Sequence, residues 1–134
     1  MNIVLDASTL IALLKDEAGA DIVEAFLEDP QHTCFIHAVN VCEVFYKYAH
    51  HTDAETVETA IADLSRSGID INRDLDDKFS REVGQLKMKL QSPSLADCFC
   101  VALAIRLGAT LLTADRPDFE PDAREGLCAV QFIR

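Results

Sequence analysis

The sequence lacks the long hydrophobic runs of a membrane protein. Hydrophobic residues make up 49% of the chain, yet no window approaches the roughly 18 uninterrupted apolar residues that a membrane span needs. We also expect no signal peptide at the start of this sequence, because Asp6 interrupts the first apolar stretch and no basic segment precedes it. We therefore expect a cytoplasmic protein that does not contact a membrane.

The sequence is also poor in basic residues, with 12 Lys and Arg against 23 Asp and Glu and a net charge of -11. A protein of this charge repels phosphate, so charge alone argues against nucleic-acid binding. Two features can reverse this repulsion of phosphate locally. One is divalent cations bound by clustered carboxylates, and the other is one segment that holds five basic side chains. That segment contains Arg73, Lys78, Arg81, Lys87 and Lys89. The acidic balance also suits a basic protein partner.

No disulfide framework or zinc site is indicated. The five cysteines are odd in number, and Cys42, Cys98 and Cys100 fall inside apolar helical patterns, which favours reduced thiols in the core. The four histidines lack the paired spacing with cysteine that is typical of zinc ligands. A cysteine nucleophile would need a partnered base, and none is evident beside Cys98.

Short apolar runs alternate with helical patterns along the whole chain, without repeats or low-complexity linkers. The expected strands are 2–5, 33–36, 69–72, 109–113 and 128–133. The expected helices are 6–14, 18–27, 39–48, 54–64, 75–90 and 93–108, and 116–121 is expected to be a loop. Strands separated by helices predict an α/β fold, a three-layer α/β/α sandwich with a central, mostly parallel sheet. With 134 residues, we expect a single domain over 1–134.

Two carboxylates frame the helix and strand between Pro93 and Asp115. Asp97 lies in the first turn of the apolar helix, and Asp115 follows the strand, where open α/β sheets gather functional groups. Asp6 follows the first strand and joins them if the two strands are neighbours. Glu43 lies on the middle helix, one position off its apolar stripe.

Each acid also has a structural explanation. Asp6 suits the N-cap of the first helix, and Asp115 suits the turn before Pro117. The segments 40–43 and 94–97 both fit a capping box, in which the last acidic side chain reaches back to the helix start. Four unpaired carboxylates at one sheet edge would nevertheless repel each other and need cations, and oxygen ligands select Mg²⁺ or Mn²⁺. Such ions bind phosphoesters and activate water.

The chain resembles the PIN-domain nucleases, and most of all the VapC-type toxin ribonucleases of bacterial toxin–antitoxin pairs. The resemblance covers almost the whole length, in order. The matching motifs are Leu5-Asp6-Ala7-Ser8, Glu43-Val44, Ser94-Leu95-Ala96-Asp97 with Ala102 and Ala104, and Leu112-Thr113-Ala114-Asp115 with Phe119 behind it.

The resemblance implies a site and an activity. The positions Asp6, Glu43, Asp97 and Asp115 match the acidic quartet, which holds Mg²⁺ or Mn²⁺ and supports hydrolysis of single-stranded or structured RNA by an activated water. Ser8 and Thr113 match hydroxyl positions that orient these ligands. Asp118 matches a further acidic position, although Pro117 makes the spacing one residue longer. His37 departs from the family, which usually has a small hydroxyl residue there.

The resemblance also implies partners: a small antitoxin whose basic tail enters the acidic groove, and a second copy of this chain. Lys87, Lys89 and Arg116 are candidates for contact with the RNA backbone. Their alternatives are a solvated helix face for the two lysines and a local ion pair with Asp115 for Arg116.

Two other functions stay open at this point. A catalytically weak PIN-fold module could serve only in binding or regulation, without a role as a toxin. A phosphatase of another α/β family could use Asp6 as a nucleophile. However, the haloacid-dehalogenase type has a second aspartate two positions later, where this chain has Ser8.

Overall fold

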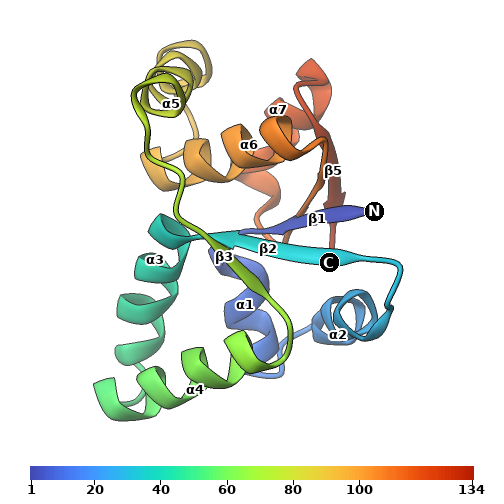
Figure 1. Cartoon of the computed structure of the whole chain (residues 1–134), viewed down its shortest axis with the longest axis vertical. Helices are drawn as coiled ribbons and strands as arrows, with labels where there is room; N and C mark the ends of the chain where they lie inside the picture. The colour runs from blue at the N-terminus through green and yellow to red at the C-terminus, as the bar shows by residue number, and fades with distance from the viewer.

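A five-stranded, all-parallel sheet forms the centre of the computed structural model (Figure 1), which describes the backbone of residues 1–134 and the side chains of residues 1–121 and 125–134. The strand order is β3-β2-β1-β4-β5. The strands are β1 (Asn2–Leu5), β2 (Thr33–His37), β3 (Asp70–Asn72), β4 (Thr110–Thr113) and β5 (Ala129–Phe132). The condition for Asp6 to lie near Asp115 is met, because β1 and β4 are neighbours and Leu5 is paired with Leu112.

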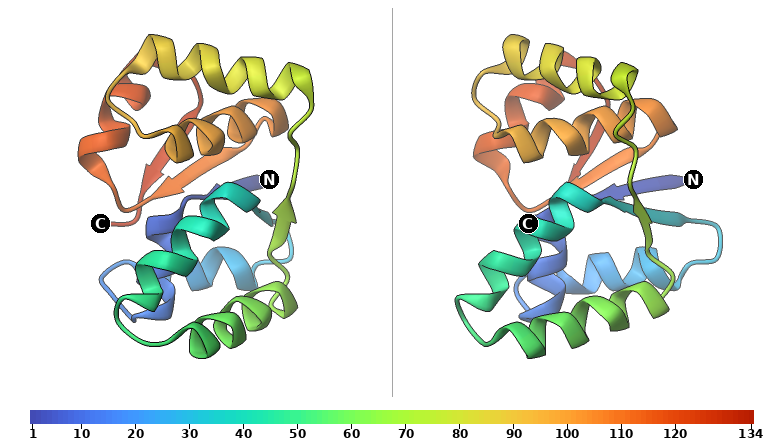
Figure 2. Two further views of the ribbon diagram at one scale, coloured as in Figure 1. Left: turned by 90° about the vertical axis from the view of Figure 1, so that its left-hand side faces the viewer. Right: turned by 60° about the vertical axis from the view of Figure 1, so that its left-hand side comes forward.

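The chain contains seven helices over its described backbone. They are α1 (Ala7–Leu14), α2 (Ala20–Glu28), α3 (Ala38–Ala49), α4 (Ala54–Arg66), α5 (Asp77–Leu90), α6 (Leu95–Leu107) and α7 (Arg116–Glu125). Helices α5, α6 and α7 lie on one side of the sheet and α1 to α4 on the other, as both views in Figure 2 show. The predicted α/β class with three layers is therefore confirmed.

Two apolar clusters, one on each face, hold the layers together. Val4 and Leu111 point into the cluster beneath α6, whereas Ile3, Leu5 and Leu112 point into the cluster with α1 and α2. All five side chains are fully buried. The central strands are therefore apolar on both faces, as expected of a parallel sheet covered by helices.

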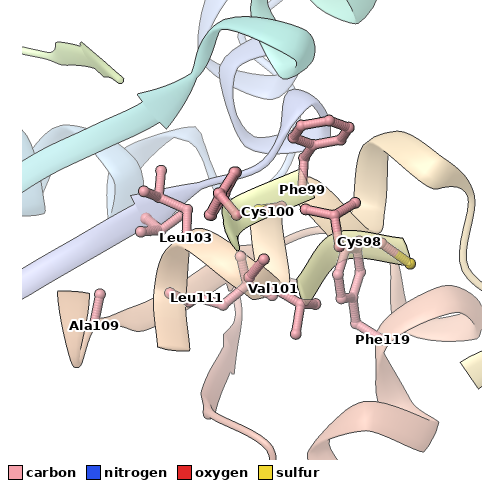
Figure 3. Close-up of a cluster of buried hydrophobic side chains, with 13 residues drawn as sticks. Cys98, Phe99, Cys100, Val101, Leu103, Ala109, Leu111 and Phe119 are labelled. Carbon is pink, nitrogen blue, oxygen red and sulfur yellow. The ribbon is translucent and has the colours of Figure 1, made fainter. Parts of the chain in front are cut away.

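Helix α6 is the main buried helix, and residues 97–104 are buried without interruption. Figure 3 shows Phe99, Val101 and Leu103 of α6 among the side chains of one apolar cluster, with Leu111 of β4 and Phe119 of α7. Cys98 and Cys100 are buried there as predicted, but Cys42 is exposed on α3. Its expected place in the core was wrong, because it lies on the outer face of its helix.

The structure corrects two local predictions. Residues 116–121 were expected to form a loop but begin helix α7, in which Pro117 occupies the first turn, where proline is tolerated. The capping box expected at 40–43 is absent from the described structure, because α3 begins at Ala38 and Asn40 already lies inside it. The cap is His37 instead, whose Nδ1 accepts a hydrogen bond from the Val39 N–H at 3.1 Å.

Among the described residues, no single helix is long and apolar enough to cross a membrane. The pair α5 and α6 has the length and composition of a span only when the two helices are counted together, across a bend of 117°.

Candidate functional site

The candidate site lies at the carboxyl edge of the sheet, where β1 and β4 end side by side. Asp6 follows β1, and Asp115 follows β4 by two residues. The first turn of α6 brings Asp97 to the same edge, and α3, which contacts both α1 and α6, carries Glu43. Parallel strands deliver their carboxyl ends to one edge, so residues distant along the chain meet there.

Asp6 is the most tightly held of these acids. Its carboxylate accepts hydrogen bonds from the Ser8 hydroxyl at 2.7 Å, the Thr113 hydroxyl at 2.7 Å and the Thr9 N–H at 3.1 Å. Asp6 is therefore the N-cap of α1, as predicted, and is also tied to β4. Burial raises its pKa to about 6, even though the three hydrogen bonds lower it, and the charge of Asp115 adds to the rise.

Ser8 and Thr113 also bind the backbone that leads to Asp115. The Ser8 hydroxyl accepts from the Ala114 N–H, and the Thr113 hydroxyl accepts from the Asp115 N–H, both at 2.9 Å. Each hydroxyl thus donates to Asp6 and accepts from the segment after β4. These two residues fix the relative position of two predicted site acids.

Asp97 forms the predicted capping box of α6. Its N–H donates to the Ser94 hydroxyl, and its carboxylate accepts from the Ser94 N–H, both at 3.1 Å. Burial raises the pKa of Asp97 to about 7, and the charges of Asp118 and Asp6 contribute to the rise while the bonds to Ser94 oppose it. The neighbouring negative charges show that Asp97 and Asp6 share one electrostatic environment.

Asp115 and Asp118 begin helix α7 next to this pair. The Asp118 N–H donates to the Asp115 carboxylate at 3.2 Å, so Asp115 caps the helix. Burial and the charge of Asp115 raise the pKa of Asp118, whereas a hydrogen bond with Asp97 lowers it. The extra residue, Pro117, lies in the first turn of α7. Asp118 therefore still lies close enough to Asp97 to interact with it.

Glu43 lies at the margin of the cluster and has a cationic partner. Its Oε1 is 2.8 Å from the ammonium group of Lys47, one turn further along α3. The bond to Glu43 raises the pKa of Lys47, to which the charge of Asp97 also contributes. The structure therefore brings Asp6, Asp97, Asp115 and Asp118 together, with the Glu43–Lys47 pair beside them.

The three cations predicted to contact RNA have other partners. The Lys87 ammonium donates to the backbone oxygens of Gln91 and Pro93, both at 2.8 Å, and closes the C-terminus of α5. Lys89 is 3.7 Å from Glu125. The Arg116 guanidinium lies over the Phe132 ring, at 4.5 Å, and donates to the Arg134 carbonyl. The suggested ion pair with Asp115 is therefore not the one formed, and Arg116 pairs with Glu120 at 3.5 Å.

Two polar side chains near Glu43 were missed from the sequence. Lys47 follows Glu43 by four residues, the spacing of a helical ion pair, and this signal could have identified it. Asn40 precedes Glu43 by three residues and is fully buried. Its burial depends on tertiary contacts of α3, so no sequence pattern revealed it.

The donor set suits a hard divalent cation. Four aspartates and one glutamate offer only oxygen ligands, and burial together with neighbouring negative charges raises the pKa values of Asp6 and Asp97. As the side chains stand, no group of three or more His, Cys, Asp and Glu among the described residues is arranged to hold an ion. Binding would thus require carboxylates to turn away from their present partners, as Glu43 would from Lys47.

Fold and cluster together define an α/β protein with an acidic site at the carboxyl edge of a parallel sheet. A family model described as the PIN domain matches residues 3–120, a range that includes all five acids. The chain belongs to the PIN domain family.

Solved structures share this fold over nearly their whole length. DNA-bound VapBC from Salmonella typhimurium is 16% identical, with a TM-score of 0.76 and coverage of 100% of this chain and 99% of that one. VapBC2 from Rickettsia felis, bound to a promoter DNA fragment, is 20% identical, with a TM-score of 0.73 and 98% coverage of both chains. VapC20 from Mycobacterium tuberculosis, a toxin that cleaves the sarcin-ricin loop, is 13% identical, with a TM-score of 0.72 and coverage of 90% and 94%. A comparison with curated protein sequences finds no significant match.

Proposed function

We propose that this protein is a Mg²⁺- or Mn²⁺-dependent endoribonuclease that hydrolyses phosphodiester bonds of single-stranded RNA. The observation that carries the proposal is the cluster of Asp6, Asp97, Asp115 and Asp118, in which burial, with a smaller contribution from neighbouring negative charges, raises the pKa values of Asp6, Asp97 and Asp118. A cluster of this kind costs stability unless a cation neutralises it. Membership of the PIN family and the likeness to an RNA-cleaving toxin support the choice of reaction.

In the proposed reaction, Asp6, Asp97 and Asp115 would hold the divalent ion, and Glu43 would complete the set of ligands. The bound ion would contact a phosphate oxygen and lower the pKa of a water molecule. Ser8 and Thr113 keep the Asp6 carboxylate oriented through their 2.7 Å bonds. Asp118, which lies beside Asp97, would take up a proton from the attacking water.

Cleavage assays on purified protein test this function. With a fluorogenic RNA oligonucleotide, we expect cleavage with Mg²⁺ or Mn²⁺, its loss with a chelator, and a decrease of at least about a hundredfold in Asp6→Asn and Asp97→Asn. Asp21→Asn is the matched control, because Asp21 is an exposed acid in the first turn of α2. Full activity of the Asp97 variant would contradict the assignment.

We also propose that the protein is the toxin of a toxin–antitoxin pair and that the antitoxin is basic. Solved structures with this fold include VapBC complexes, and a net charge of -11 suits a cationic tail. An arginine of such a tail can pair with Asp6, Asp97 or Asp115 and keep the divalent ion out. Co-expression with a neighbouring reading frame, followed by a cleavage assay with and without that partner, tests this role.

A catalytically weak binding module is the second candidate. It is favoured by the partners of Lys87, Lys89 and Arg116, which leave these predicted RNA contacts engaged elsewhere. Calorimetric titration with Mn²⁺ separates the two functions, since a binding module has no need of the ion. Absence of binding at millimolar Mn²⁺ would favour the module.

A further inference from the structure

The Glu43–Lys47 ion pair places a positive charge at the edge of an acidic site. The two groups are 2.8 Å apart on successive turns of α3, with Glu43 on the N-terminal side, the favourable order for a helical pair. The Glu43 side chain is 13% exposed and the Lys47 side chain 50% exposed. The Glu43 side chain is thus mostly buried, whereas the Lys47 side chain is half open to solvent.

Lys47 differs from the other cations near the site in what it binds. In the part of the chain that the structure describes, it is the one cation paired with a predicted metal ligand. The charges of Asp97 and Asp118 also interact with it. Lys47 therefore stands within the electrostatic field of the acidic cluster.

Helix α3 offers Glu43 a second partner on its other side. Asn40 lies one turn before Glu43 and is fully buried, and among the described residues neither atom of its amide has a hydrogen-bond partner. Helical side chains lean toward the N-terminus, so a Glu43 released from Lys47 would extend over the turn of Asn40. The amide N–H could then donate to the carboxylate, which would satisfy a buried donor.

We propose that Lys47 is an internal counter-cation for Glu43, that a divalent cation displaces its ammonium group from that carboxylate, and that the released ammonium group then binds a phosphate of the RNA strand. This inference rests on the proposed function. Metal and lysine compete for one carboxylate, whereas metal and phosphate do not compete for the lysine. Binding of the ion would therefore free a cation for the substrate in a chain that has few.

The test compares Lys47→Gln with the wild type in two binding measurements. Calorimetric titration with Mn²⁺ at pH 7.5 should show about two- to fivefold tighter binding in the variant, the range expected when a half-exposed competing ion pair is removed. Anisotropy with a labelled RNA oligonucleotide, with Ca²⁺ in place of Mg²⁺, should show weaker binding. The slope of log affinity against log salt should fall by about 0.7, the value for one phosphate contact of a single strand.

Three further variants separate the competing explanations. Lys15→Gln makes the same charge change at the end of α1 opposite to Asp6 and should leave both measurements unchanged. Lys47→Arg keeps the cation and should retain RNA binding. In the Glu43→Gln background, Lys47→Gln should no longer tighten Mn²⁺ binding, because the shared carboxylate is gone.

Each result supports or overturns a stated part of the proposal. Unchanged or weaker Mn²⁺ binding in Lys47→Gln, with normal binding in the wild type, overturns the competition and leaves the nuclease function standing. Tighter Mn²⁺ binding with unchanged RNA binding overturns the phosphate contact. A wild type that binds no Mn²⁺ and cleaves no RNA overturns both this inference and the proposed function.

Discussion

At the scale of single residues, structural and functional roles coincide in the acids of this protein. Asp6 caps α1 through Thr9 and also bonds to Thr113 across the sheet edge. Asp97 closes the capping box of α6 and faces Asp118. A helix N-terminus stabilises a carboxylate, so capping offsets part of the repulsion that the cluster creates. Helix capping and membership of the acidic site, the two explanations that the sequence offered for these residues, are therefore not alternatives.

The raised pKa of Asp97 predicts how the stability of the metal-free protein depends on pH. In the unfolded chain the group titrates near pH 4, but in the folded protein its pKa is about 7. Between these values the folded state binds more protons, so the free energy of unfolding falls as pH rises from about 4 to 7. Asp97→Asn removes this penalty and should stabilise the protein at pH 8 by about 1–2 kcal/mol.

Urea unfolding at pH 5 and pH 8, with a chelator present, measures the effect. The difference between Asp97→Asn and wild type should be small at pH 5 and should grow toward pH 8. Asp21→Asn, an exposed acid on α2, should show no such trend. Equal stability changes at both pH values would mean that the pKa of Asp97 is not raised in the folded state.

At the scale of elements, helix starts bring the site together. Helices α1, α6 and α7 all begin at the carboxyl edge of the sheet, and Asp6, Ser94 and Asp115 cap them. Helix α7 was missed in the sequence because Pro117 and Pro121 were read as loop residues. Pro117 lies in the first turn, where proline is permitted, whereas Pro121 lies inside the helix, and burial of Phe119 against the core stabilises the helix in spite of it.

Ser94→Ala tests the capping box as a positioning device for Asp97. Loss of the cap should lower the free energy of unfolding by about 1 kcal/mol and weaken Mn²⁺ binding, because the carboxylate loses its fixed position. Asp53→Ala is the matched control: Asp53 caps α4 by accepting from Thr56 N–H at 2.8 Å, on a helix that carries none of the site acids. It should cost similar stability and leave Mn²⁺ affinity unchanged. Equal affinities in both variants would reject the positioning role.

At the scale of the whole molecule, the net negative charge and the exposed apolar surface indicate how the protein binds other proteins. A groove of about 290 Å³ lies between α5 and α6, where Leu86, Ile105 and Leu127 contribute its apolar lining. Ile105 is 47% exposed and Met88 on α5 is 78% exposed. Exposed apolar patches of this kind mark interaction surfaces.

We predict that a second copy of the chain covers this surface. Light scattering after size exclusion should give a dimer for the wild type, and Ile105→Glu should shift it toward monomer without unfolding it, because the side chain is half exposed in one copy. Leu75→Glu is the control, since Leu75 is 62% exposed but precedes α5 and does not line the groove. A monomeric wild type at micromolar concentration would exclude this interface.

The sequence by itself determined the alternation of strands and helices, the caps at Asp6 and Ser94, and the acids that belong to the family motif. Hydrophobic periodicity and capping depend on neighbours in the chain, so they can be read locally. Only the tertiary structure decided that Asn40 is buried without a protein partner among the described residues, and that Lys87, Lys89 and Arg116 are engaged away from the acids. Burial, and contacts between side chains that are far apart in the sequence, depend on which faces the packed helices turn toward one another.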